Sequence, residues 1–275
     1  MINYNGTLIS ASNVQLTHQN RAFKYGDGIF ETIKIQHNKI VFWEDHYFRL
    51  MASMRMLRMK IPMEFTLEFL EEEILKTVKN IENPIIRVRL NVYRKDGGLY
   101  LPTTNEIDYL IEAKSYTPST KDIYKIDLYK DFYNYSGLLS TIKTTNRMVN
   151  TLAAIFANEN DMDNCILLNE HKNVVEAING NIFIVKDSVI KTPSLTDGCI
   201  KGVVRKKIIE ILQKHPDYTV EEASISPFEL QKADEVFITN AMVGVQSVTN
   251  YRKKQFKTEI AFKLQNSLKL IQATS

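Results

Sequence analysis

The stretch STIKTTNRMVNTLAAIF, residues 140–156, places a single lysine, Lys143, between small hydroxyl residues and the start of an apolar helical pattern. No acidic residue lies within several positions of Lys143 to pair with its charge. A lysine amine in apolar, crowded surroundings has a lowered pKa and becomes a usable nucleophile. The alternative is a solvated lysine at the beginning of a helix, which is the commoner use of this residue. The stretch alone leaves both interpretations open.

Composition and charge narrow the class of protein. The chain has 275 residues, 44% of them hydrophobic and 24% charged, which is ordinary for a globular protein of one large or two modest domains. A formal net charge of +3 is too small to indicate nucleic acid as a partner, and no apolar run approaches the roughly 20 residues that cross a membrane. The first ten residues lack the layout of a signal peptide. Cys165 and Cys199 show no metal-ligand spacing, so we expect reduced thiols and a cytoplasmic protein.

Periodicity divides the chain into strands and helices. Ile86, Val88, Leu90 and Val92 alternate with polar residues and predict a strand, with residues 107–116 as its partner. The same patterns predict a hairpin at 2–10, strand pairs at 164–177 and 181–193, a strand and turn at 235–248, and amphipathic helices at 44–59, 203–215 and 258–273. Together they predict an α+β or α/β fold in two domains, residues 1–116 and 123–275, joined by a polar linker at 117–122.

Most motifs that carry chemistry are missing from the sequence. GDGIFE, starting at Gly26, has the first two glycines of a dinucleotide-binding fingerprint but lacks the third, and no clear strand precedes it. The chain contains no Walker-type phosphate loop, no HExxH and no GxSxG. Its five histidines are scattered, so we expect no metal site.

What remains is a set of dispersed single features. His46 and Arg49 are three residues apart and share a helix face. Glu176 follows two valines in a predicted strand, where an inward carboxylate needs a partner. Gly202 precedes a helix whose first amides are suited to bind phosphate, and residues 239–241 form a polar break after a strand. Taken one at a time, each is more simply explained as a surface, packing or capping residue.

Six pieces of the sequence, taken in order, resemble the class IV aminotransferase family, the fold-type IV enzymes that use pyridoxal 5'-phosphate. They are RAFKYGDGIFETIKI, HYFRL, IKTTNR, VVEAINGNIFIV, GCIKGVVR and TNA. The resemblance runs from about residue 17 to about residue 250. The resemblance implies a two-domain, D-amino-acid aminotransferase-like fold with a small N-terminal α/β domain and a larger C-terminal β-barrel-like domain. It also implies a homodimer whose active site borrows a loop from the neighbouring subunit.

The resemblance assigns roles to individual residues. Lys143 would form the Schiff base with the cofactor aldehyde and later move the substrate proton. Glu176 would bond the protonated pyridine nitrogen, and Arg49 would grip the phosphate in a fork. Ala241 stands where the family commonly has a threonine at the phosphate, so only its backbone amide could serve. The full set of expected cofactor-binding residues is Arg49, Glu176, Ile200 (against the ring), Val203, Val204, Asn240 and Ala241.

The family catalyses several reactions, and this sequence departs from the pattern of each. Met148 stands where branched-chain aminotransferases usually carry a tyrosine, and Asn146 followed by an arginine is most like the aminodeoxychorismate lyases. Leu99 stands in a loop where the lyases and the D-amino-acid enzymes use an arginine, whereas Glu31 is more typical of the aminotransferases. We therefore expect Arg89 to bind the substrate carboxylate instead, with Phe30 also in the substrate site.

These signals favour an aminotransferase that acts on an α-amino acid, branched-chain-like or related and preferably of the L form, with 2-oxoglutarate as the partner acid. The alternative is an aminodeoxychorismate lyase, which would use the same lysine and cofactor to give 4-aminobenzoate and pyruvate. A third hypothesis is a non-catalytic binding protein with this fold. Lys143, Glu176 and Arg49 together argue against it, because a binding protein needs no Schiff-base lysine.

Overall fold

The computed structural model describes residues 1–118 and 121–274, which form two compact units. The first unit consists of residues 1–118 and 142–146, and the second contains the remaining described residues. The predicted linker at 117–122 spans this boundary, and its residues 119–120 lie outside the described part of the chain. The prediction assigned residues 142–146 to the second domain, but they belong to the first unit. Two backbone hydrogen bonds attach this segment to the first unit: the amide of Phe30 donates to the carbonyl of Lys143, and the amide of Thr145 donates to the carbonyl of Gly28, both at 2.9 Å.

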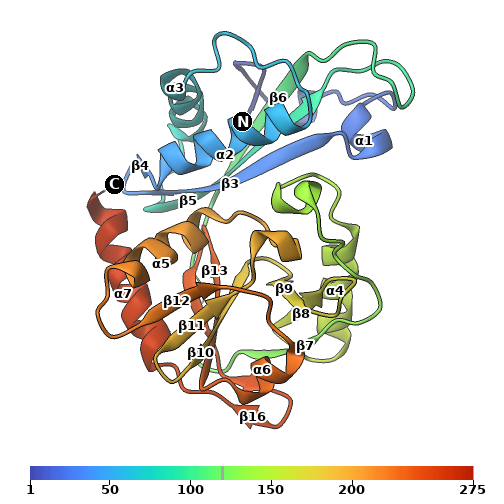
Figure 1. The fold of residues 1–275 in the computed structure, drawn as a ribbon. Helices are drawn as coiled ribbons and strands as arrows, with labels where there is room; N and C mark the ends of the chain where they lie inside the picture. The colour runs from blue at the N-terminus through green and yellow to red at the C-terminus, as the bar shows by residue number, and fades with distance from the viewer. Residues whose placement is uncertain (119–120, 275) are drawn as a thin grey trace. The chain divides into compact units, whose positions relative to one another are not determined.

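The first unit is built on a six-stranded antiparallel sheet with the strand order β2-β1-β6-β5-β3-β4 (Figure 1). Helices α2 and α3 cover one face of this sheet, and the short helix α1 precedes β3. The bounds are Ile2–Tyr4 (β1), Thr7–Ile9 (β2), Arg21–Tyr25 (α1), Gly28–Gln36 (β3), Lys39–Ile40 (β4), Trp43–Met56 (α2), Leu67–Val78 (α3), Ile85–Arg94 (β5) and Ile107–Ser115 (β6).

The predicted alternation in β5 is confirmed. Val88, Leu90 and Val92 are fully buried in the core that the sheet shares with α2 and α3. Because successive side chains of a strand point to opposite faces, Arg87 and Arg89 lie on the face away from the helices. The sheet therefore offers one apolar face for folding and one polar face that is available for chemistry.

The second unit contains two five-stranded sheets, in the orders β12-β11-β10-β13-β14 and β16-β15-β7-β8-β9. Aliphatic side chains from both sheets share one core, and helices α5 and α7 pack on the first sheet while α4 packs on the second (Figure 1). The strand bounds are Lys125–Leu128 (β7), Asn164–Leu168 (β8), Val174–Ala177 (β9), Asn181–Lys186 (β10), Val189–Thr192 (β11), Thr219–Glu222 (β12), Glu235–Asn240 (β13), Gly244–Val248 (β14), Asn250–Tyr251 (β15) and Lys254–Gln255 (β16). The helix bounds are Met148–Glu159 (α4), Val203–Gln213 (α5), Pro227–Lys232 (α6) and Glu259–Thr274 (α7).

The predicted mixture of helices and sheets is confirmed. Among the described residues, no helix combines the length and the apolar content that a membrane span requires.

Candidate active site

Lys143 lies shortly before α4, as the sequence predicted, and its segment runs alongside the start of β3. The neighbouring Ile142 is buried. Backbone hydrogen bonds at Lys143 and at Thr145 attach the segment to β3, so the position of the Lys143 backbone is set by the first unit.

Three of the predicted site residues come together around the ring of Phe30. The Nζ atom of Lys143 lies 4.6 Å from the ring centroid, and the guanidinium carbon of Arg89 lies 3.7 Å from the same centroid. The Nε of Arg89 donates to Oδ1 of Asn91 at 3.0 Å, which fixes the orientation of the guanidinium. An amine and a guanidinium are thus held against one aromatic ring on the polar face of the sheet.

Arg49 is fixed by a partner that the sequence did not identify. Its Nε donates to Oε1 of Glu31 at 2.8 Å and a terminal nitrogen donates to the other carboxylate oxygen, while Nδ1 of His46 lies 2.7 Å from Oε2. The predicted shared face of His46 and Arg49 on α2 is confirmed, because both reach this carboxylate. The expectation that Arg49 binds a phosphate stays a prediction.

The ionisation of this cluster follows from its surroundings. Burial alone raises the pKa of the Glu31 carboxyl, but the charge of Arg49 and the hydrogen bonds from His46 and Arg49 outweigh it and lower the pKa to about 2. Burial has the opposite effect on a base, and it lowers the pKa of the His46 imidazole. The sequence held a signal for this cluster: Glu31 interrupts the apolar positions Ile29 and Ile33, and a carboxylate on a buried face requires a cationic partner.

In the second unit, Glu176 and Ile200 come together. Glu176 lies on β9 and is 3% exposed, and its Oε2 accepts a hydrogen bond from the amide of Ile200 at 3.1 Å. Its Oε1 accepts from the side-chain amide of Asn134 at 3.4 Å. The predicted inward carboxylate is therefore held in place by two donors.

Helix α5 begins at Val203, after Gly202, and the chain passes very close to β10 at this point. A Cβ atom on Gly202 would lie 2.0 Å from Oδ1 of Asn181, so any larger residue here would displace the Asn181 side chain. Among the described residues no side chain caps this helix, and its first turn contains no acidic residue. The amides of Val203 and Val204 therefore begin the helix without a side-chain acceptor, which suits an anion.

Asn240 and Ala241 lie where β13 turns into β14. The Oδ1 of Asn240 accepts from the amides of Met242 at 3.0 Å and Val243 at 2.9 Å, so this oxygen closes the turn. The side-chain nitrogen of Asn240 and the backbone groups of the turn remain available to a ligand.

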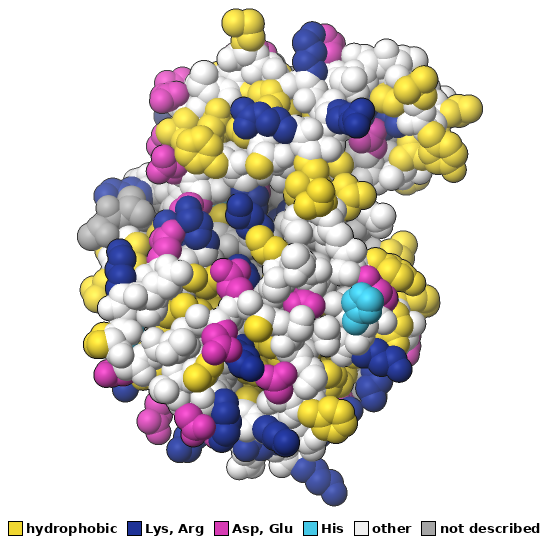
Figure 2. Space-filling view, in the orientation of Figure 1, with side chains coloured by type: hydrophobic (Ala, Val, Ile, Leu, Met, Phe, Trp, Pro, Cys, Tyr) yellow, Lys and Arg dark blue, Asp and Glu magenta, His cyan; other side chains and the backbone are white. Residues whose placement is uncertain are grey.

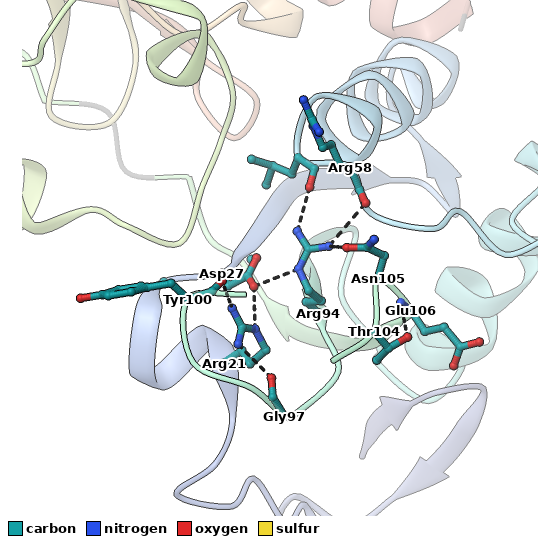
Figure 3. A network of polar contacts seen from close by, with 12 residues as sticks. Arg21, Asp27, Arg58, Arg94, Gly97, Tyr100, Thr104, Asn105 and Glu106 are labelled. Carbon is teal, nitrogen blue, oxygen red and sulfur yellow. Dashed lines mark hydrogen bonds and ion pairs between the residues drawn. The ribbon is translucent and has the colours of Figure 1, made fainter. Parts of the chain in front are cut away.

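A buried charged network, absent from the sequence prediction, holds the loop after β5 (Figure 3). Oδ2 of Asp27 accepts from Nε of Arg21 at 2.8 Å and from Nε of Arg94 at 3.0 Å. Arg94 also donates to the carbonyl of Leu57 at 2.7 Å and to Oδ1 of Asn105 at 2.5 Å. One carboxylate thus orients two arginines, and each arginine fixes a different part of the chain.

Arg21 uses the rest of its guanidinium on backbone carbonyls of this loop. It donates to Gly97 at 3.0 Å and to Leu99 at 2.6 Å. The side chains that follow are strongly exposed, with Leu99 at 73%, Tyr100 at 90% and Leu101 at 84%. Figure 2 shows a group of hydrophobic side chains at this end of the first unit, around α1. The loop is therefore apolar on its outside and tightly held from within.

Comparison with known proteins finds relatives of this chain in one enzyme family. The family model described as "Amino-transferase class IV" matches residues 28–251. An aminodeoxychorismate lyase of Vibrio harveyi is 28% identical over 87% of this chain and 88% of its own length. A protein of Aquifex aeolicus, named "Probable branched-chain-amino-acid aminotransferase", is 31% identical over 89% of this chain and 82% of its own. The solved branched-chain aminotransferase of Thermoproteus uzoniensis has the same fold, with a TM-score of 0.90 at 23% identity, covering 100% of this chain and 95% of that one.

Proposed function

The chain belongs to the class IV aminotransferase family, and from this premise we propose that it moves the amino group of an α-amino acid to a 2-oxo acid. Like the rest of its family it is an enzyme that depends on pyridoxal 5'-phosphate. When bound, this cofactor supplies an aldehyde that takes up amino groups and a ring that accepts electrons. The observation that carries the proposal is the position of Lys143 and Arg89 on the ring of Phe30.

The residues of the chain fit the cofactor. The uncapped start of α5 offers the amides of Val203 and Val204 to a phosphate, with no acidic residue in the first turn to repel it. The buried carboxylate of Glu176 suits a protonated ring nitrogen. We assign phosphate binding also to Arg49 and to the turn at Asn240 and Ala241, and ring packing to Ile200.

Lys143 is the proposed catalytic residue. Its amine would hold the cofactor covalently and, once released, would move a proton at its Nζ atom. The cation–π contact with Phe30 orients this amine. Replacing Lys143 with alanine removes this amine, so all transfer should cease.

The proposed substrate is an α-amino acid with an apolar side chain, and 2-oxoglutarate is the proposed amino acceptor. Arg89 would bind a carboxylate, since its planar guanidinium donates to Asn91 and contacts the same Phe30 ring as the amine of Lys143. Phe30 would supply an apolar wall. The name of the Aquifex aeolicus relative supports the branched-chain assignment.

The second candidate function is that of an aminodeoxychorismate lyase. The Vibrio harveyi relative favours it, as does the pair Asn146 and Arg147 that follows the lysine segment. A lyase would use the same lysine and cofactor to release pyruvate from aminodeoxychorismate.

We also propose that the enzyme is a homodimer. The loop with Leu99, Tyr100 and Leu101 presents three apolar side chains to solvent from a backbone that Arg21 holds rigid. A rigid apolar loop of this kind is suited to a second copy of the chain.

A cytoplasmic location is proposed from the thiols. Cys165 and Cys199 are both free and buried. Burial raises the pKa of the Cys165 thiol to about 11 and that of the Cys199 thiol to about 12, which keeps both protonated and unreactive. Neither cysteine forms a disulfide, which is usual for a protein in a reducing compartment.

One experiment separates the two functions. The holoenzyme is incubated with a single amino acid, and the cofactor is then released and identified by chromatography. A transaminase must convert its bound pyridoxal 5'-phosphate into pyridoxamine 5'-phosphate with at least one of leucine, glutamate or alanine, and we expect the L forms to do so. Added 2-oxoglutarate should reverse the conversion. If no amino acid of either hand converts the cofactor while aminodeoxychorismate releases pyruvate, the lyase function replaces the one proposed.

A further inference from the structure

The hydroxyl of Thr239 in the second unit is buried without a hydrogen bond from or to the described residues. Thr239 is the fifth residue of β13 and is 1% exposed, and its Oγ1 has no hydrogen-bond partner among the described residues. Buried hydroxyls are almost always bonded. Thr192 in the same sheet shows the usual case, because its hydroxyl donates to the carbonyl of Ile182 at 2.9 Å.

The register of the sheet sets the direction of this hydroxyl. Thr239 is directly opposite Asn181 of β10, and opposed residues of antiparallel strands carry their side chains on the same face. The next such pair confirms this, since the rings of Phe183 and Phe237 stack at 4.9 Å. Asn181 donates to the carbonyl of Ile200 at 2.7 Å. The side chain of Thr239 therefore lies on the sheet face that meets the turn before α5.

That turn leads to the uncapped start of α5. The side chain of Asn181 fills the space beside Gly202, as the 2.0 Å approach to its hypothetical Cβ shows. Helix α5 has 11 residues, and its first turn has neither a side-chain cap nor an acidic residue within the described chain. Two groups of donors that need a hydrogen-bond acceptor thus lie on the same side of the sheet. They are the helix amides, which have no side-chain acceptor, and the buried hydroxyl, which has no partner.

We propose that Thr239 is a phosphate-binding residue whose hydroxyl donates a hydrogen bond to the cofactor phosphate at the start of α5. This inference rests on the proposed function, because it takes pyridoxal 5'-phosphate as the ligand. A phosphate has more acceptor sites than two helix amides can satisfy, and hydrogen bonds to a charged oxygen are the strong ones. Ala241, two residues further along, has no hydroxyl, so Thr239 is the hydroxyl that this strand can contribute.

Two substitutions test the assignment. Thr239→Val removes the hydroxyl but keeps the branched shape, and Thr239→Ser keeps the hydroxyl. Thr192→Val is the matched control, because it removes a buried hydroxyl from the same sheet that already has a backbone partner. Each full-length apoprotein is titrated with pyridoxal 5'-phosphate and, separately, with pyridoxal, which lacks the phosphate, and the dissociation constants are measured by equilibrium dialysis.

For Thr239→Val we expect the dissociation constant of pyridoxal 5'-phosphate to rise about tenfold, with that of pyridoxal unchanged. Thr239→Ser should stay within about twofold of the wild type. The apoprotein of Thr239→Val should melt no lower than the wild type because no protein hydrogen bond is lost, whereas Thr192→Val should melt lower and bind the cofactor normally.

Unchanged binding of pyridoxal 5'-phosphate by Thr239→Val overturns the inference alone, and so does an equal loss for pyridoxal. If Thr239→Val does not fold, Thr239→Ala provides the same comparison. A wild-type protein that binds no pyridoxal 5'-phosphate overturns the proposed function, and this inference with it.

Discussion

Replacing Glu31 with glutamine should destabilise the first unit, and by an amount that depends on pH. The folded protein holds the pKa of this carboxyl at about 2, against an ordinary value of 4.5. Each unit of such a shift corresponds to about 1.4 kcal/mol. The ionised carboxylate therefore contributes about 3 kcal/mol to folding at neutral pH, an order-of-magnitude value for a buried pair. The substitution also leaves the guanidinium of Arg49 without its bidentate partner.

The sign of the pH dependence follows from the lowered pKa. Above pH 4.5 Glu31 is ionised in both the folded and the unfolded chain, so its full contribution is present. Between 4.5 and about 2 the unfolded chain takes up the proton first, and the contribution is lost as the pH falls. The difference in unfolding free energy between the wild type and Glu31→Gln should accordingly be largest at pH 7 and should shrink steadily below 4.5.

The assay is urea unfolding followed by the fluorescence of Trp43, the only tryptophan of the chain. Trp43 begins α2 and is buried, so it reports on the unit that contains Glu31. Glu106→Gln is the control: Glu106 also pairs with two cations, Lys60 and Lys95, but on the surface, where ion pairs contribute little. A loss below about 1 kcal/mol at pH 7, or a loss that is the same at pH 7 and pH 3, would refute the reasoning.

Three further predictions concern the site and its loop. Glu176→Gln should retain bound cofactor but lower turnover ~100-fold, as loss of one electrostatic interaction near a reacting group implies; equal turnover would remove Glu176 from the site. Arg89→Leu should raise the KM for the amino acid by roughly tenfold or more, whereas Arg87→Leu, on the same strand face, should change it less than about twofold; equal effects would count against Arg89 as the carboxylate ligand. Arg21→Lys keeps the charge beside Asp27 but loses the guanidinium fork on the loop carbonyls, so chymotrypsin should cleave at Tyr100 several times faster; an unchanged rate would show that the loop is held by other contacts.

Local patterns in the sequence were sufficient for most of the helices and strands, and motifs in order supplied several of the proposed site residues. The alternation through Val88, Leu90 and Val92 identified β5 and its apolar face because a strand repeats every two residues. The start of α6 is also encoded locally, because Ser226 forms a capping box with Glu229 and Pro227 occupies the first turn. The resemblance to the family selected Lys143 and Phe30 together with Arg89, and the structure gathers these three around one ring.

Contacts between residues far apart in the chain could not be read in this way. Arg21 reaches the carbonyls of Gly97 and Leu99, more than 70 positions along the chain, and nothing in the local sequence of either segment indicates the other. The sequence shows Glu31 as a carboxylate among apolar residues. Its partner Arg49 lies on helix α2, and the sequence of the strand does not indicate which helix residue reaches it.

The sequence by itself therefore determined the class of fold and the family, and it supplied Lys143 as the proposed reactive amine, since each depends on short-range periodicity or on motifs in order. Only the tertiary structure assigned residues 142–146 to the first unit, through two backbone hydrogen bonds to β3. Only the tertiary structure placed the hydroxyl of Thr239 on the sheet face that meets the start of α5, through the register of β10 and β13. The physical reason is the same in both cases. The register of two strands, and the place where a distant segment joins a sheet, are set by packing across the whole unit, and no stretch of the sequence encodes them locally.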